Sequence, residues 1–196
     1  MLNKVIVRKK ASALRNNLFL ELGKDCIESK RFLDFLSLIK TKLNLKSIAI
    51  YYPIKTEISP LKLVSISKQL GLTVSLPVMF KGLKFLSFKV WSGDQKLNKS
   101  YYGTLEPPHE NKLIIPEIMI VPLLAFDKNL NRLGYGKGYY DTTINKIRNK
   151  GKLFLTVGLG YDNQEFDKIP IEKHDQRMDV IMTEKKIIYK NENLFS

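Results

Sequence analysis

Ten consecutive residues, from Arg132 to Asp141, combine residue types that could bind a phosphorylated ligand and a metal ion. The segment reads Arg-Leu-Gly-Tyr-Gly-Lys-Gly-Tyr-Tyr-Asp, with three glycines at alternate positions. Glycine lacks a Cβ and adopts positive φ readily, so backbone N–H groups can approach an anion closely. Arg132 and Lys137 supply positive charge, and the Asp141 carboxylate is a ligand that Mg²⁺ prefers. The segment therefore predicts a site for a nucleotide and its metal.

The glycine spacing differs from the two common nucleotide-binding patterns. A Walker A loop requires Gly-x-x-x-x-Gly-Lys-Ser/Thr, and a dinucleotide fingerprint requires Gly-x-Gly-x-x-Gly directly after a strand. A glycine-rich turn between a strand and a helix also occurs as simple chain reversal. The spacing alone therefore leaves the ligand class open.

Length and composition indicate a single domain. The chain has 196 residues, which suits one domain spanning residues 1–196. A hydrophobic content of 44%, with 10% aromatic residues, excludes a mostly disordered chain. No apolar run approaches the roughly 18 to 20 residues of a membrane span, and the charged N-terminus does not resemble a secretory signal. We therefore expect a cytoplasmic protein without a membrane partner and, independently of these observations, we expect a monomer.

The charge balance points to an anionic partner. The chain carries 33 Lys and Arg against 19 Asp and Glu, a formal net charge of +14. The basic residues are spread along the chain and accompany no nucleic-acid-binding motif, so a small polyanionic substrate would be served by the same field. The single Cys26 excludes an internal disulfide, and the separation of His109 from His174 excludes a zinc-ligand spacing.

Hydrophobic periodicity and local start and stop signals predict the order of the elements. Helices are expected over residues 3–20, 29–43, 60–70 and 138–149. Strands are expected over residues 47–52, 73–78, 84–90, 117–121, 153–159, 179–182 and 186–189. The segment 91–115 is rich in polar and turn-forming residues, so we expect a loop with at most one short helix.

This alternation of strands and helices predicts an α/β fold. We expect a three-layer α/β/α sandwich with a largely parallel sheet, in which ligands bind beyond the carboxyl ends of the strands. Residues 132–141 occupy a strand-to-helix connection. They therefore lie where such a fold places its active site.

The longer run from Val121 to Asp141 resembles the signature of the 5-formyltetrahydrofolate cyclo-ligase family, also called 5,10-methenyltetrahydrofolate synthetase. The run reads Val-Pro-Leu-Leu-Ala-Phe-Asp-Lys-Asn-Leu-Asn-Arg-Leu-Gly-Tyr-Gly-Lys-Gly-Tyr-Tyr-Asp, and about twenty positions match in kind and order. Weaker similarities occur at Lys4-x-x-x-Arg8, at residues 52–57 and at His174-Asp175. The resemblance therefore spans essentially the whole chain.

Three positions depart from the family pattern. Leu130 stands where the family usually has glycine, so we expect an altered turn at residues 129–131, where asparagine tolerates positive φ. Thr142 replaces an arginine that commonly follows the aspartate, which removes a supporting charge. Val7 replaces a leucine, a simple change within the core. Residues 91–115 cannot be aligned with the pattern.

The resemblance implies an ATP-dependent ring closure. In the family, 5-formyltetrahydrofolate and MgATP give 5,10-methenyltetrahydrofolate, ADP and phosphate. The γ-phosphoryl group moves to the formyl oxygen, and N10 of the same folate attacks the activated carbon. Phosphoryl transfer requires mainly positioning and neutralisation of charge, and holding the folate bent favours the intramolecular attack.

The resemblance also implies a role for each candidate residue. Lys137 and Arg132 are the expected catalytic cations, and Asp141 and Asp175 are the expected Mg²⁺ ligands. The expected nucleotide-binding residues are Lys4, Arg8, Arg132, Leu133, Gly134, Tyr135, Gly136, Lys137, Gly138, Tyr139 and Tyr140. The expected folate-binding residues are Tyr52, Glu57, Tyr135, Gly136, Lys137, Gly138 and Tyr139.

Two other functions are consistent with parts of the sequence. The net charge of +14 would suit a nucleic-acid-binding protein, which would bind oligonucleotides in a steeply salt-dependent manner. A sugar-phosphate isomerase or acyl-transferase could use a similar α/β scaffold, because fold alone does not fix function. Turnover without ATP would identify an enzyme of that kind.

Overall fold

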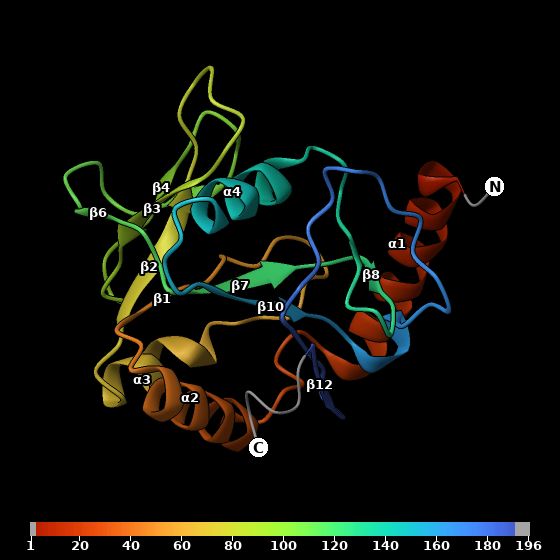
Figure 1. Ribbon diagram of the computed structural model, residues 1–196, viewed down its shortest axis with the longest axis horizontal. Helices are drawn as coiled ribbons and strands as arrows, with labels where there is room; N and C mark the ends of the chain where they lie inside the picture. Colours follow the sequence, from red (N-terminus) through yellow and green to blue (C-terminus); the bar gives the residue numbers. More distant parts are fainter. Residues whose placement is uncertain (1–2, 191–196) are drawn as a thin grey trace.

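A mixed sheet of eight strands forms the centre of the protein. The computed structural model describes residues 3–190. In sheet order, the strands are β12 (Ile187–Tyr189), β11 (Val180–Met182), β10 (Leu155–Leu159), β7 (Ile118–Pro122), β1 (Ser47–Ala49), β2 (Thr73–Val78), β3 (Ser87–Val90) and β6 (Leu113–Ile114) (Figure 1).

The central strands of this sheet are parallel and the edge strands are antiparallel. Strands β11, β10, β7, β1 and β2 pair in parallel, whereas β12, β3 and β6 join in antiparallel pairs. Every residue of β10 is buried, as is typical of a parallel strand covered on both faces. The prediction of a largely parallel sheet is confirmed.

Helices cover both faces of the sheet. Helices α2 (Ser29–Leu43) and α3 (Lys62–Gln69) lie against one face, and α4 (Tyr139–Arg148) lies against the other (Figure 1). Successive side chains of a strand point to opposite faces. Accordingly, Ile118 and Ile120 of β7 join the hydrophobic core beneath α2 and α3, whereas Met119 and Val121 pack in the core beneath α4. These three layers confirm the predicted α/β/α sandwich.

Helix α1 (Lys4–Leu22) lies at the end of the sheet beside a small hairpin of β8 (Ala125–Phe126) and β9 (Arg132–Leu133) (Figure 1). The Asn3 side chain caps this helix by accepting from the Val5 N–H at 2.8 Å. Val7 and Ala11 on one face of α1 pack with Leu133 of the hairpin. One face of α1 is thereby directed at the segment that follows β7.

The structure differs from the sequence expectation in several places. Residues 91–115 contain no helix but three short strands: β4 (Asn98–Lys99), β5 (Leu105–Glu106) and β6. Strands of two residues carry no periodicity, so they could not be detected in the sequence. Strand β1 ends at Ala49 and β3 begins at Ser87, so both are shorter than expected. Within residues 3–190, no helix is long and apolar enough to cross a membrane.

Candidate active site

The glycine-rich segment connects the hairpin at the carboxyl end of β7 to helix α4. Gly136 and Gly138 have positive φ values of 93° and 72°, and Gly138 precedes the first turn of α4. Gly134 does not have positive φ, contrary to a simple expectation for all three glycines. A Cβ at Gly134 would instead lie 3.0 Å from Nη1 of Arg132. Positive φ therefore favours glycine at Gly136 and Gly138, and close approach of the Arg132 side chain favours it at Gly134.

Arg8 of α1 packs directly on this segment. Its Nε donates a hydrogen bond to the Gly134 carbonyl oxygen at 3.0 Å. A Cβ at Gly136 would lie 3.0 Å from the guanidinium carbon of Arg8, so a side chain there would displace the arginine. The predicted association of the N-terminal helix with the glycine-rich segment is therefore present in the structure.

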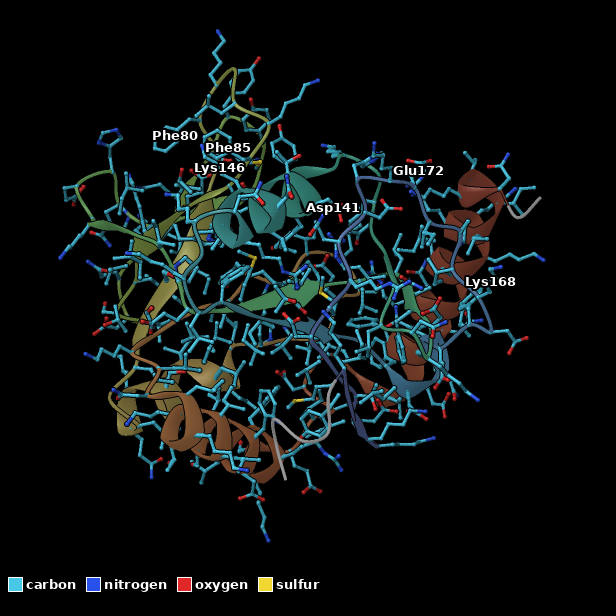
Figure 2. All side chains as sticks on the ribbon, viewed as in Figure 1. Phe80, Phe85, Asp141, Lys146, Lys168 and Glu172 are labelled. Carbon is cyan, nitrogen blue, oxygen red and sulfur yellow. The ribbon has the colours of Figure 1, made fainter. Side chains whose placement is uncertain are left out.

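A polar cavity of about 190 Å³ lies between α1, the glycine-rich segment and residues 172–175. It contains every expected nucleotide-binding residue and both expected metal ligands. The lining comprises Lys4, Arg8, Arg132, Leu133, Gly134, Tyr135, Gly136, Lys137, Gly138, Tyr139, Tyr140, Asp141 and Asp175, together with Pro122, Glu172 and His174. The N-terminal end of α4 borders this cavity, and backbone N–H groups at a helix N-terminus favour a phosphate. Figure 2 shows Asp141 and Glu172 on the same side of the molecule, between α4 and α1.

The two expected metal ligands are in different surroundings. Oδ1 of Asp141 accepts from Nη2 of Arg132 and from the Gln176 N–H, both at 3.0 Å, while its Oδ2 has no hydrogen-bond partner within residues 3–190. Oδ2 of Asp175 accepts from Lys4 Nζ and the Glu172 N–H, both at 2.6 Å. Carboxylate oxygens suit Mg²⁺, so Asp141 fits such an ion as it stands. Oδ1 of Asp175 also has no hydrogen-bond partner among the described residues, so Asp175 keeps one oxygen for the ion, with the Lys4 ammonium beside it.

Arg132 and Lys137 differ in burial and in whether the charged group has a partner in the protein. The Arg132 side chain is 4% exposed and pairs with Asp141, but its Nε is buried without a partner in the described part of the chain. Lys137 is exposed and makes no hydrogen bond or ion pair with any described residue. A phosphate oxygen would satisfy the Arg132 Nε, and Lys137 is free to reach the same ligand.

A second, aromatic cavity of about 150 Å³ adjoins the polar cavity. Its lining is Tyr51, Tyr52, Ile54, Glu57, Pro77, Met79, Leu86, Thr104, Leu105, Pro122, Tyr135, Tyr139 and Tyr140. Pro122 and the three tyrosines of the glycine-rich segment line both cavities. Tyr52 and Glu57, the two expected folate-binding residues outside that segment, are thus brought into contact with it.

Among the described residues that line the aromatic cavity, Glu57 alone is acidic, and it is 3% exposed. Its Oε2 accepts from the Ile54 N–H at 3.0 Å. Burial raises the pKa of Glu57, while the Ile54 N–H, Arg15 and Tyr135 each oppose this shift. An ionised Glu57 can accept hydrogen bonds from N–H groups of a ligand, which is the chemistry that a pterin ring presents.

Arg15 is a residue of this site that the sequence analysis missed. It is buried on α1, with 2% of its surface exposed, and its Nη2 donates to the Tyr135 hydroxyl. Arg15 follows Arg8 by seven residues, or two helical turns, so it lies on the same face of α1 as Lys4 and Arg8. That spacing was the signal available in the sequence, because it places a third cation on the helix face that already carried the two expected phosphate ligands.

The turn before the glycine-rich segment departs from the expectation for residues 129–131. The residue with positive φ is Leu130 itself, at 61°, and neither neighbouring asparagine has it. Asp127 organises the turn, because its Oδ1 accepts from the Asn129 and Asn131 N–H groups at 3.0 and 3.1 Å. The chain therefore keeps the backbone conformation that suits glycine while placing a leucine there.

Known proteins resemble this chain over most of its length. The model of the 5-formyltetrahydrofolate cyclo-ligase family matches residues 7–184. A 5-formyltetrahydrofolate cyclo-ligase of Haemophilus influenzae is 35% identical over 135 residues, covering 66% of this chain and 71% of the relative. A 5-formyltetrahydrofolate cyclo-ligase of Mycoplasma genitalium is 28% identical over 167 residues, covering 83% of this chain and 87% of the relative. The solved Aquifex aeolicus 5,10-methenyltetrahydrofolate synthetase superimposes with a TM-score of 0.76 at 30% identity, covering 96% of this chain and 93% of its own.

These similarities confirm the resemblance drawn from residues 121–141 and the prediction of a ligase enzyme. The matched region includes the glycine-rich segment, Glu57 and Asp175, whereas Lys4 precedes it. Because the family model covers nearly the whole chain, the protein belongs to the 5-formyltetrahydrofolate cyclo-ligase family.

Proposed function

We propose that the protein converts 5-formyltetrahydrofolate into 5,10-methenyltetrahydrofolate in an ATP- and Mg²⁺-dependent reaction that releases ADP and phosphate. Family membership supports the folate chemistry. The observation that carries the proposal is the shared wall between the two cavities. Tyr135, Tyr139 and Tyr140 line both a polar cavity rich in cations and an aromatic cavity that contains Glu57. A phosphoryl donor and a pterin could therefore meet across this wall.

The polar cavity is the proposed ATP site. Lys4, Arg8, Arg132 and Lys137 line it, and the N-terminal end of α4 adds backbone N–H groups. We assign Lys137 and Arg132 to the transferring phosphoryl group, since one is unpaired and the other has an unpartnered Nε within residues 3–190. Preorganised cations are most effective where charge develops during transfer.

Asp141 and Asp175 are the proposed ligands of Mg²⁺. Oδ2 of Asp141 is available, and Arg132 and the Gln176 N–H hold the carboxylate in place through Oδ1. A magnesium ion bound there would neutralise phosphate charge. Asp175 would bind the ion through Oδ1, and Lys4, which pairs with its Oδ2, lines the cavity proposed for the phosphates.

The aromatic cavity is the proposed folate site. Glu57 would accept hydrogen bonds from pterin N–H groups, and Tyr52 would pack on the ring. Tyr135, Gly136, Lys137, Gly138 and Tyr139 would border the formyl group, where the two substrates meet.

The proposed reaction has two steps, transfer of the phosphoryl group and then ring closure. The formyl oxygen attacks the γ-phosphorus of ATP, and ADP leaves. The N10 lone pair then attacks the formyl carbon, N10 loses its proton, and the carbon–oxygen bond breaks so that phosphate departs with the electron pair. The N5–C–N10 amidinium of the product remains. Because N5 and N10 belong to one molecule, a cavity that holds the folate bent supplies a high effective concentration.

The remaining parts of the proposal concern the protein as a whole. We propose that residues 1–196 act as a single domain and a monomer in the cytoplasm, with small-molecule substrates and no nucleic-acid or membrane partner. The clustering of Lys4, Arg8 and Arg132 around one cavity supports the small-molecule part of this proposal, because it gives part of the net positive charge a small anionic ligand.

A spectroscopic assay tests the proposed function. Purified protein is mixed with MgATP and 5-formyltetrahydrofolate, and methenyl absorbance near the ultraviolet edge of the visible is followed together with ADP. We expect product and ADP in equal amounts, and no product when ATP is omitted. A folded sample that forms no product would overturn the proposal, and product formation without ATP would favour the isomerase or acyl-transferase class.

A further inference from the structure

Arg15 is a buried cation that the proposed chemistry does not use directly. It lies on α1, lines neither cavity, and has 2% of its surface exposed. A buried charge is costly unless its hydrogen bonds are satisfied. The contacts of Arg15 therefore identify the groups that it serves.

These contacts join three segments that are far apart in sequence. Nε donates to Thr56 Oγ1 at 3.2 Å, Nη1 donates to the Leu123 carbonyl at 3.4 Å, and Nη2 donates to the Tyr135 hydroxyl. The guanidinium carbon also lies 5.3 Å from the centroid of the Tyr135 ring. Thr56 precedes Glu57, so Arg15 joins the segment that carries Glu57 to the Tyr135 side chain, and both of these residues line the aromatic cavity.

The donors of Arg15 also fix the direction of the Tyr135 hydrogen bond. A guanidinium has only donors, so the Tyr135 oxygen must act as an acceptor toward Arg15. Its own hydrogen is then available to the Glu57 carboxylate, with which Tyr135 interacts. The Ile54 N–H donates to the same carboxylate at 3.0 Å. Every one of these contacts favours an ionised Glu57 that can only accept hydrogen bonds.

We infer that Arg15 is a positioning residue for the folate site, which orients Tyr135 and keeps the Glu57 carboxylate an ionised acceptor for the N–H groups of the pterin. The inference rests on the proposed function, because it assigns the aromatic cavity to the folate. Among the described residues, other charged or titratable groups that act on Glu57 include Lys55, Tyr51 and Tyr140. Of these groups only Arg15 and Lys55 are cations, and Lys55 is exposed to solvent, which screens its charge.

Binding of 5-formyltetrahydrofolate without ATP, measured by titration calorimetry from mildly acidic to neutral pH, tests the inference. For Arg15→Met we expect binding at neutral pH to weaken by about tenfold, the range of a hydrogen bond to a charged group. Burial already raises the pKa of Glu57, and loss of the Arg15 charge would raise it further, so binding would fall off at a higher pH than in the wild type. KM for ATP should change less than folate binding does, because Arg15 does not line the polar cavity and acts on it only through Tyr135.

Two further variants separate positioning from a general loss of structure. Tyr135→Phe removes one hydroxyl without changing the ring, and it should shift the acid limb of binding in the same direction. Lys10→Met, an exposed cation on the same helix, should bind as the wild type does. If Arg15→Met fails to fold, the inference is tested with Tyr135→Phe. An unchanged pH dependence of 5-formyltetrahydrofolate binding in that variant would overturn the inference. If the wild type itself does not bind 5-formyltetrahydrofolate, the proposed function fails instead.

Discussion

Lys4 Nζ lies 2.6 Å from Oδ2 of Asp175, so an expected phosphate ligand and an expected metal ligand are paired with each other. Glu172 is 3.1 Å from the same ammonium group. The Lys4 ammonium neutralises these carboxylates, so a divalent cation that binds Asp175 would compete with it. The pair thus couples the proposed metal and phosphate sites.

Replacing Asp175 should increase the amount of Mg²⁺ that the enzyme requires. Asp175→Asn removes the charge that attracts both Lys4 and the metal, so we expect half-maximal activity at a Mg²⁺ concentration about tenfold higher or more. Steady-state rates over a Mg²⁺ titration at fixed ATP measure this. Asp167→Asn, at an exposed loop position, is the control and should not change the titration. Equal Mg²⁺ dependence in wild type and Asp175→Asn would remove Asp175 from the metal site.

Asp141 should contribute more to stability than an exposed ion pair does. The Arg132 side chain is 4% exposed and Asp141 neutralises it at 3.0 Å. Removing one member of a buried pair leaves an uncompensated charge, so Asp141→Ala should lower the free energy of unfolding by about 3 kcal/mol. Lys186 pairs with Glu165 at 2.6 Å but is 44% exposed, so Lys186→Met should cost less than about 1 kcal/mol. Urea unfolding without Mg²⁺ measures both variants. Equal losses in the free energy of unfolding would show that burial does not strengthen the pair of Arg132 and Asp141.

Lys137 should affect the chemical step without affecting stability. The side chain is exposed and makes no contact that an alanine would break within residues 3–190. Loss of a group that stabilises transition-state charge lowers kcat by about 100-fold or more. We therefore expect that loss for Lys137→Ala, with an unchanged melting temperature. Lys128→Ala, another exposed lysine, is the matched control. Full activity of Lys137→Ala would refute its catalytic assignment and leave family membership intact.

Local sequence predicted the elements better than it predicted the contacts between them. Helix α2 and strand β2 have the expected bounds, because each has a clear apolar period. The position of the glycine-rich segment between a strand and a helix was also predicted. The hydrogen bond from Arg15 to Tyr135 joins residues that are 120 positions apart in the sequence, so it depends on the folded topology. Residues 98–106 form a hairpin whose two short strands have no hydrophobic periodicity. The sequence therefore could not predict that Thr104 and Leu105 of this hairpin line the aromatic cavity.

Gly136 should be required for Arg8 to remain in place. Its φ of 93° strains any L-residue, and a Cβ would lie 3.0 Å from the Arg8 guanidinium carbon. Gly151 has a φ of 66° with nothing within 4 Å of its Cβ position, so Gly151→Ala reproduces backbone strain alone. Both alanine variants should lose about 1–2 kcal/mol of stability. Only Gly136→Ala should also raise KM for ATP, and similar KM values for both would show that Arg8 does not depend on this glycine.

Leu130 combines a strained backbone with a buried side chain, and the packing energy of the side chain is expected to exceed the strain energy. Its φ of 61° would be relieved by glycine, a gain of about 1–2 kcal/mol. However, Leu130 is 3% exposed in the core beneath α4, and truncating a buried leucine costs about 2–5 kcal/mol. Leu130→Gly should therefore lower the free energy of unfolding by about 1–3 kcal/mol, although it introduces the glycine expected from the family resemblance.

Lys55 provides the matched comparison for this prediction. Its φ is 53° and its side chain is exposed, so Lys55→Gly relieves similar backbone strain without removing a core side chain. We expect Lys55→Gly to have equal or higher stability than the wild type in the same urea titration, in contrast to Leu130→Gly. If Leu130→Gly instead proves more stable than the wild type, strain at this turn outweighs packing. The leucine would then be a destabilising departure from the family pattern and not one compensated by the core.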